Sequence, residues 1–218
     1  MIRHRQLLFW VFLVVLGACL IWRLPINGWG SLIWFTGSVA LFVIRHPHQT
    51  KTQDMVTAQR FNAGTEQLLL ILVTLGMQVI PGVHLVTGLL EFADHAGGTV
   101  APAIGFFALL TGLWLFWRSH VDLGRNWSVT LELRQYHGLI TKGVYTHIRH
   151  PMYTAIFLIS TAQLLLIANW IAGPAALIAF SLMCIFRIPQ EERMMKEQFG
   201  DRYQQYMDRT RRFFPKVY

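Results

Sequence analysis

The sequence predicts an all-α, polytopic transmembrane protein with about six membrane-embedded helices, and two observations support this fold class. The chain of 218 residues is 54% hydrophobic and only 14% charged, whereas soluble domains average about 25% charged residues. The apolar residues also gather in six long runs, and none of these runs alternates apolar with polar residues as membrane β-strands do. The same composition excludes a disordered chain and a disulfide-stapled secreted domain.

The six apolar runs give the expected helices in their order. They occupy residues Leu7–Trp22, Gly28–Ile44, Gln67–Val86, Thr99–Trp117, Met152–Ala168 and Ile171–Arg187. The last two runs form an almost continuous stretch of 36 residues. One straight helix of that length would measure about 54 Å, whereas the hydrocarbon core of a bilayer is only ~30 Å thick. We therefore expect a C-terminal helical hairpin that turns at Gly173 and Pro174, since both residues break helices.

The distribution of basic residues predicts the orientation of these helices. If the amino terminus is cytoplasmic and the chain crosses the membrane at every run, 18 of the 19 lysines and arginines lie in cytoplasmic segments, and only Arg23 lies outside. This bias follows the positive-inside rule. The net charge of +8 is then a signal of topology, and we expect no binding to nucleic acid.

Polar stretches divide the chain into parts. The linker Arg45–Glu66 predicts that residues 1–66 form an N-terminal transmembrane hairpin with its linker, and that residues 67–218 form the core. Two further polar blocks, the loop Arg118–Arg149 and the tail Arg187–Tyr218, flank the terminal hairpin on one side of the membrane. We expect these two blocks to fold together into a cytoplasmic lid.

The two lid blocks also carry the residues that are the best candidates for binding or catalysis. The loop contains Arg149-His150-Pro151-Met152-Tyr153, and the tail begins Arg187-Ile188-Pro189-Gln190-Glu191. Pro151 suits the first turn of the hairpin helix, which places His150 beside backbone N–H groups that can bind a carboxylate. Arg187 and Glu191 share a face if their segment is helical, although Pro189 favours a kink. A charge pair at the membrane-facing end of a helix indicates a functional site.

In this order and at this distance, the two blocks resemble the isoprenylcysteine carboxyl methyltransferase family, integral-membrane methyltransferases with phospholipid N-methyltransferases as more distant relatives. The resemblance covers about residues 124–215, and Gly124–Trp127 is more like bacterial members. It implies that S-adenosylmethionine binds on the cytoplasmic side without a Rossmann domain. The residues that it assigns to the cofactor are His137, Gly138, Leu139, Ile140, Tyr145, His150, Pro151, Met152, Tyr153 and Glu191. It assigns Arg187 to the substrate, as the catalytic position.

The resemblance therefore implies a membrane enzyme that transfers a methyl group from S-adenosylmethionine to a small lipophilic acceptor, such as an isoprenylcysteine carboxylate. The reaction would be a direct displacement, in which the protein aligns the two partners and excludes water. Arg187 would orient an anionic acceptor that enters from the bilayer. The expected location is a bacterial inner membrane, with both termini in the cytoplasm.

Other interpretations of the same features stay open. A reductase of the sterol-reductase type would bind NADPH on a related membrane core, and a non-enzymatic membrane protein would need no cofactor. Leu16–Cys19 loosely resembles a lipoprotein cleavage site, but a span is favoured because apolar residues continue beyond it. Tyr203 and Tyr206 are expected to pack the tail against the membrane, and Arg211 and Arg212 to be lipid-facing anchors.

Histidine is frequent enough to raise the question of a metal site. The chain has nine histidines, and on the cytoplasmic side they form only the pairs His46/His48 and His147/His150. A di-iron centre would require several denser clusters, and one pair three residues apart is weak evidence for zinc. We expect no metal.

Overall fold

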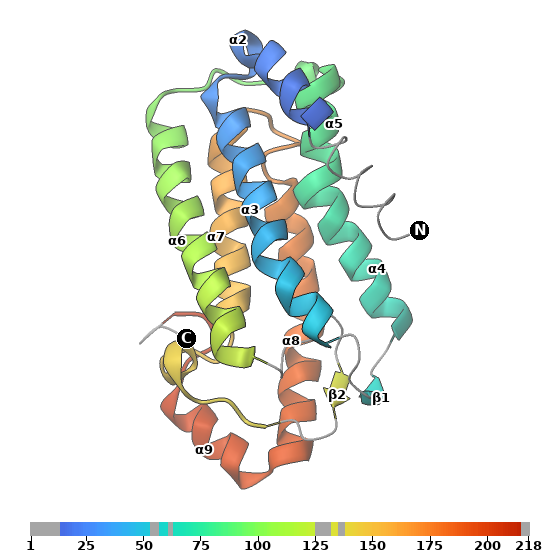
Figure 1. Cartoon of the computed structure of the whole chain (residues 1–218), viewed down its shortest axis with the longest axis vertical. Coiled ribbons are helices and arrows are strands. Elements are labelled where there is room, and N and C mark those ends of the chain that lie inside the picture. Colours follow the sequence, from blue (N-terminus) through green and yellow to red (C-terminus); the bar gives the residue numbers. More distant parts are fainter. Residues whose placement is uncertain (1–13, 53–56, 61–62, 125–131, 135–137, 215–218) are drawn as a thin grey trace.

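The protein is an elongated bundle of long helices (Figure 1). The computed structural model describes residues 14–52, 57–60, 63–124, 132–134 and 138–214. Its main elements, in order, are helical residues 14–22, α2 (Leu24–Asn27), α3 (Trp29–Thr52), β1 (Thr57–Arg60), α4 (Ala63–Thr74), the π-helix η1 (Leu75–Val79), α5 (Ile80–Thr87), the 3-10 helix η2 (Glu91–Ala93), α6 (Val100–Leu123), β2 (Glu132–Arg134), the 3-10 helix η4 (Gly143–Thr146), α7 (Pro151–Leu166), α8 (Ala175–Phe199) and α9 (Asp201–Arg209). The all-α class is confirmed, with one short antiparallel pair of strands, β1 and β2.

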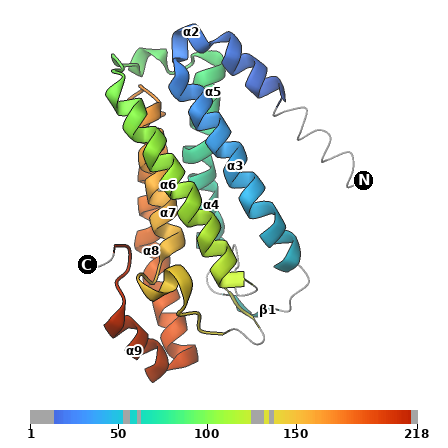
Figure 2. The same cartoon turned by 60° about the vertical axis from the view of Figure 1, so that its left-hand side comes forward.

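The two ends of the bundle differ in character. One end holds α2 and the connections at residues 88–99 and 167–174; the other holds the β1–β2 pair, η4 and α9 (Figures 1 and 2). We call the second end the lid end. Arg23 lies at the first end and forms an ion pair there with Glu91. Arg23, which the charge pattern separates from the other basic residues, thus lies away from the lid end.

Outward-facing apolar side chains indicate that lipid surrounds the bundle. Two helical stretches, Gly64–Thr87 and Val100–Leu123, are long and apolar enough to cross a membrane, yet only 28% and 22% of their most apolar windows are buried in the protein. Large side chains such as Phe107 and Trp114 are more than half exposed. A soluble protein would bury such helices in its core, so these surfaces fit a bilayer instead.

Helix boundaries differ from the expected runs at the lid end. The expected linker begins at Arg45, but α3 continues to Thr52 through Pro47. In the same way α8 continues through Arg187 and Pro189 to Phe199. Polarity marks where a helix leaves the bilayer, and it does not by itself end the helix. In α8 the polar extension is rich in glutamate, lysine and arginine, which are good helix formers. The predicted turn of the terminal hairpin is confirmed, since α7 ends at Leu166 and α8 follows Pro174.

A buried glutamine joins three elements near the first end of the bundle. Gln163 of α7 is 3% exposed, and its Oε1 accepts a hydrogen bond of 3.2 Å from Nε1 of Trp34 in α3. Its Nε2 donates to the carbonyl oxygens of Gly76 in η1, at 2.9 Å, and of Ala172, at 2.8 Å. A buried amide is stable only when such partners satisfy it. Gln163 therefore fixes α3, the π-helix and the hairpin turn against one another.

Candidate functional site

The tail returns to the start of α7, so two segments far apart in sequence lie side by side. The backbone N–H of Arg149 donates to the carbonyl oxygen of Arg211 at 2.7 Å, and that of His150 donates to Arg212 at 3.0 Å. Thr154, one turn into α7, donates through Oγ1 to the carbonyl oxygen of Phe213 at 2.8 Å. The predicted folding of the loop onto the tail is confirmed by these contacts.

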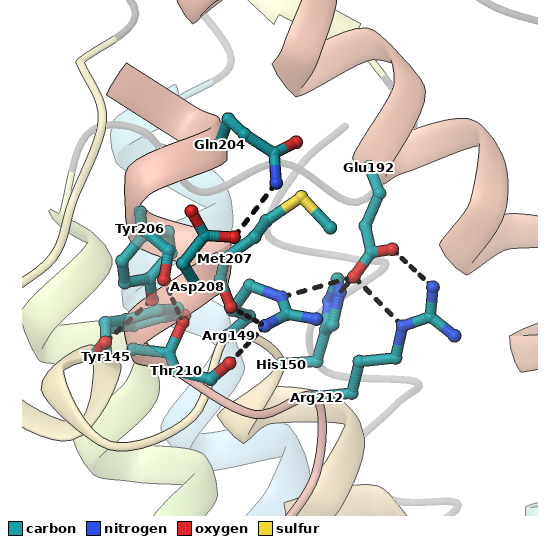
Figure 3. Close-up of polar contacts among 10 residues, drawn as sticks. All are labelled: Tyr145, Arg149, His150, Glu192, Gln204, Tyr206, Met207, Asp208, Thr210 and Arg212. Atoms are coloured by element: carbon teal, nitrogen blue, oxygen red, sulfur yellow. Dashed lines mark hydrogen bonds and ion pairs between the residues drawn. The ribbon is translucent and has the colours of Figure 1, made fainter. Parts of the chain in front are cut away.

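A buried carboxylate lies at the centre of this junction (Figure 3). The side chain of Glu192 in α8 is only 6% exposed. Its Oε1 lies 3.3 Å from Nε2 of His150 and 3.3 Å from Nε of Arg149. Arg212 binds both of its oxygens, through Nη2 at 2.6 Å and Nε at 3.1 Å. Burial alone would raise the pKa of Glu192, but the hydrogen bonds and charges of His150 and Arg212 lower that pKa to about 2. The carboxylate therefore stays ionised and joins α8, α7 and the tail.

Helix α9 is fastened to the same junction. Nη1 of Arg149 donates to the carbonyl oxygens of Met207, at 3.1 Å, and of Thr210. The hydroxyl of Tyr206 donates to the carbonyl oxygen of Tyr145 at 2.7 Å (Figure 3). Burial raises the pKa of Tyr206 to about 12, so its hydroxyl keeps the proton that it donates. We call η4, the start of α7, α9 and residues 210–213 the lid.

A cavity of about 880 Å³ lies beneath the lid and continues between α3 and the α4–α5 stretch. Ten of the eleven predicted site residues line it: Gly138, Leu139, Ile140, Tyr145, His150, Pro151, Met152, Tyr153, Arg187 and Glu191. The remaining one, His137, lies outside the described residues. Pro151 occupies the first turn of α7 and His150 precedes it, as predicted. The structure thus gathers the predicted positions from loop, hairpin and tail around one space; their roles stay predictions.

Arg187 and Glu191 meet at this cavity through Tyr153. The hydroxyl of Tyr153 donates to Oε2 of Glu191 at 2.7 Å and also lies within hydrogen-bonding reach of Arg187. Nη1 of Arg187 forms an ion pair of 3.1 Å with Oε1 of Glu66 in α4, and both side chains are nearly buried. As the spacing of four residues indicated, Arg187 and Glu191 line the same cavity. The ion pair between Arg187 and Glu66 was not predicted, because the sequence pattern placed Glu66 in a linker.

The rest of the cavity is apolar and belongs to the N-terminal half. Residues 14–22 contribute Val15, Leu16 and Cys19, and the α4–α5 stretch contributes Val73, Met77, Val83 and Val86 among others. We call this part the apolar limb. The cavity is therefore amphipathic: charged and aromatic groups line it under the lid, and aliphatic side chains line it inside the bundle.

Sequence reasoning missed several residues of the lid. Arg212 was expected to be a lipid-facing anchor; this was wrong, since it binds Glu192. Tyr203 and Tyr206 were expected to pack the tail against the membrane, but both are buried and line the cavity. The sequence signal for Tyr203 and Tyr206 was their helical spacing in an otherwise polar segment. Arg212 gave no such signal, because its partner lies on another helix.

No group of three or more histidine, cysteine, aspartate or glutamate side chains that could hold a metal ion occurs among the described residues. His147 and His150 were the lid-side pair of interest. His150 is engaged with Glu192, which gives it a structural partner.

The fold and the site define an integral membrane protein whose helical core carries a cavity closed at one end by a lid. The family model of the isoprenylcysteine carboxyl methyltransferases matches residues 103–197, which include α7 and most of α6 and α8. The resemblance to this family is thereby confirmed over that segment.

Individual relatives agree with the family match. Protein-S-isoprenylcysteine O-methyltransferase B of Arabidopsis thaliana is 30% identical over 92 residues, which cover 41% of this chain and 47% of the relative. Protein-S-isoprenylcysteine O-methyltransferase of Schizosaccharomyces pombe is 30% identical over 119 residues, which cover 53% and 49%. The chain thus spans about half the length of the curated relatives that it matches.

The fold extends further than the sequence match. A solved structure of the eukaryotic intramembrane Ras methyltransferase ICMT superimposes on 94% of this chain and 74% of its own, with a TM-score of 0.55 and 18% sequence identity. At that identity the likeness concerns the fold. It includes helices from the N-terminal half, which the family model does not reach.

Proposed function

We propose that the protein is a membrane methyltransferase that transfers a methyl group from S-adenosylmethionine to a small lipophilic acceptor of the isoprenylcysteine carboxylate kind. The observation that carries this proposal is the amphipathic cavity, in which residues Gly138–Ile140, Tyr153 and Glu191 lie at one end and the apolar limb at the other. A charged, water-soluble donor and an apolar acceptor need such a two-sided space if they are to meet at the membrane.

The residues under the lid fit S-adenosylmethionine by size and by chemistry. The cavity of about 880 Å³ lies within the range of ~300–1,000 Å³ usual for small-molecule sites. Tyr145 and Tyr153 line it and offer ring faces to adenine or to a sulfonium cation. The carboxylate of Glu191 supplies an acceptor for polar hydrogens, and the backbone of Gly138–Ile140 supplies a wall without bulky polar groups. When bound, the cofactor supplies an activated methyl group on sulfur.

In this mechanism the protein aligns the methyl donor with the acceptor and does not need to transfer a proton. A carboxylate acceptor is already nucleophilic, so no strong base is needed next to it. Arg187 would hold the acceptor carboxylate by a charge-assisted hydrogen bond, while Glu66 and Tyr153 hold the guanidinium in place. Closure of the lid around Glu192 excludes water from the reacting atoms.

Calorimetry with purified protein tests the cofactor assignment. The wild type should bind S-adenosylmethionine and not NADPH, and Glu191→Ala and His150→Ala should each weaken this binding at least tenfold, because each removes a polar group from the cavity wall. Arg193→Ala, which removes an exposed surface pair with Glu197, is the matched control and should bind normally. Binding of NADPH would favour the reductase, and binding of neither would favour a protein without enzymatic activity.

Arg187→Ala should impair methyl transfer more than cofactor binding. The expected loss in kcat/KM for the acceptor is about 10²-fold, since a charged hydrogen bond of ~1.5–3 kcal/mol disappears from the site. Because this change also leaves Glu66 without its ion pair, the double variant Arg187→Met/Glu66→Gln serves as a second measurement. Equal losses of transfer and of S-adenosylmethionine binding would remove the acceptor role.

We further propose that the lid end and both termini face the cytoplasm of a bacterium, with the chain in its inner membrane, and that residues 67–218 form the methyltransferase core. A membrane-impermeant thiol reagent applied to intact cells should leave a cysteine placed at Lys142 unlabelled and should label one placed at Asp94, since η4 follows Lys142 at the lid end and Asp94 lies at the other. The reverse pattern would invert the topology.

A further inference from the structure

A second arginine faces the cavity from the N-terminal half of the chain. Arg45 lies on α3 and lines the same space as Arg187, and the two positive charges are close enough to repel each other. Arg187 is held by Glu66 and Tyr153. Two arginines that line one half-buried space favour an anion beside them, because an anion relieves the repulsion between their positive charges.

The position of Arg45 on α3 matters as much as its charge. The residues of α3 that line the cavity recur at helical spacing, from Trp34 through Ser38, Val39 and Phe42 to Arg45. They form one face, about 16 Å long at ~1.5 Å per residue, on a helix that runs toward the lid end (Figure 1). This face is apolar for most of its length and carries its charge at the end nearest Arg187.

The wall of the apolar limb opposite α3 is also apolar. Val73, Met77 and Val86 line it from the α4–α5 stretch, and Cys19 lines it from residues 14–22. An amphiphile with one anionic head and a long apolar chain matches this distribution of side chains if its chain lies along α3 and its head lies near Arg45 and Arg187.

We propose that Arg45 binds the anionic head of the methyl acceptor together with Arg187, so that α3 forms the acceptor-binding wall of the site. This inference rests on the proposed methyl transfer, and it goes beyond it by giving the N-terminal helices a binding role in place of a purely packing one. It also makes Arg45 a determinant of specificity: acceptors with a carboxylate are preferred over neutral amphiphiles of equal length.

Kinetics with N-acetyl-S-farnesylcysteine as the probe test the role of Arg45. The variant Arg45→Ala should raise the KM for this acceptor at least about tenfold and should change the affinity for S-adenosylmethionine less than twofold. Arg45→Lys should fall between the wild type and Arg45→Ala, because it keeps the charge and loses the planar fork. Arg193→Ala is the matched arginine control from the exposed surface. An unchanged acceptor KM in Arg45→Ala, or an equal loss of cofactor affinity, would overturn the proposal.

A native cysteine reports binding without turnover. Cys19 lines the limb and is partly accessible, whereas Cys184 is buried and is replaced by serine to leave one thiol. The farnesylated acid should slow the reaction of Cys19 with a lipophilic maleimide in the wild type and much less in Arg45→Ala, while its methyl ester should protect both proteins equally and weakly. If no methyl transfer occurs at all, the proposed function fails, and the protection of Cys19 alone decides this inference: equal protection in both proteins refutes it.

Discussion

Replacing Glu192 with alanine should open the lid and abolish tight binding of S-adenosylmethionine. Removal of this buried carboxylate leaves the guanidinium of Arg149 and the imidazole of His150, which are 9% and 3% exposed, without their shared partner. Breaking a buried ion pair from one side costs about 3–5 kcal/mol. In a protein of this size such a loss lowers the melting temperature by roughly 10 °C.

The neighbouring pair Arg193–Glu197 provides the control for this change. It lies on the same helix, has the same chemistry and is mostly exposed, with side chains 81% and 55% accessible. Glu197→Ala should therefore alter the melting temperature by at most about 1 °C, since exposed pairs contribute little. Thermal unfolding in detergent and calorimetric titration of both variants measure the two effects. Equal stability of Glu192→Ala and Glu197→Ala would show that the lid does not depend on the buried carboxylate.

The same carboxylate gives the lid a defined dependence on pH. The pKa of Glu192 is about 2 in the folded protein, below its ordinary value of 4.5. Its stabilising contribution is therefore complete above pH 4.5 and is lost as the pH falls toward 2. Glu192→Gln should lack this part of the acid destabilisation, so its melting temperature should fall less steeply than that of the wild type across this interval.

The second large effect is expected at Gly30, where α3 touches the hairpin turn. A Cβ added there would overlap the carbonyl oxygen of Leu166 and lie 3.0 Å from its carbonyl carbon. Both groups belong to backbone, so neither can rotate away. Gly30→Ala should therefore destabilise the protein by about 3 kcal/mol, at the upper end of the usual cost of overpacking.

Gly64, at the start of α4, is the matched position. A Cβ there meets nothing within 4 Å. Gly64→Ala should leave stability unchanged or raise it by up to about 1 kcal/mol, because alanine loses less conformational entropy in a helix than glycine does. Thermal unfolding of the two variants separates them. If Gly30→Ala were as stable as Gly64→Ala, α3 would not be packed tightly on the hairpin, and its role as a wall of the cavity would be weakened.

Local patterns predicted much of the fold because they act over short distances. The apolar runs located the long helices, and Gly173 and Pro174 located the hairpin turn. Helix ends at the lid side were misplaced, since α3 and α8 stay helical after their sequences become polar. The pairing of β1 with β2 joins segments that are separated along the chain by the α-helices α4, α5 and α6, and no short-range pattern encodes such a contact.

The candidate site likewise contains positions that the sequence could predict and contacts that it could not. The positions that line the cavity could be predicted, because they fall in two compact motifs that resemble those of a family. The partners of Glu192 could not, because Arg149, His150 and Arg212 reach it from separate segments. Arg45 escaped notice for the same reason: only the packing of α3 beside the cavity shows that its charge is near that of Arg187.

The closure of the lid by residues 201–213 has a consequence for biosynthesis. These residues leave the ribosome after every transmembrane helix of the described chain, yet Tyr206, Thr210 and Arg212 complete contacts with Tyr145, Arg149 and His150, which are made much earlier. A nascent chain that is already inserted therefore has an open polar end until residues 201–213 have been translated. The transmembrane helices can therefore assemble in the bilayer before the lid covers the cavity.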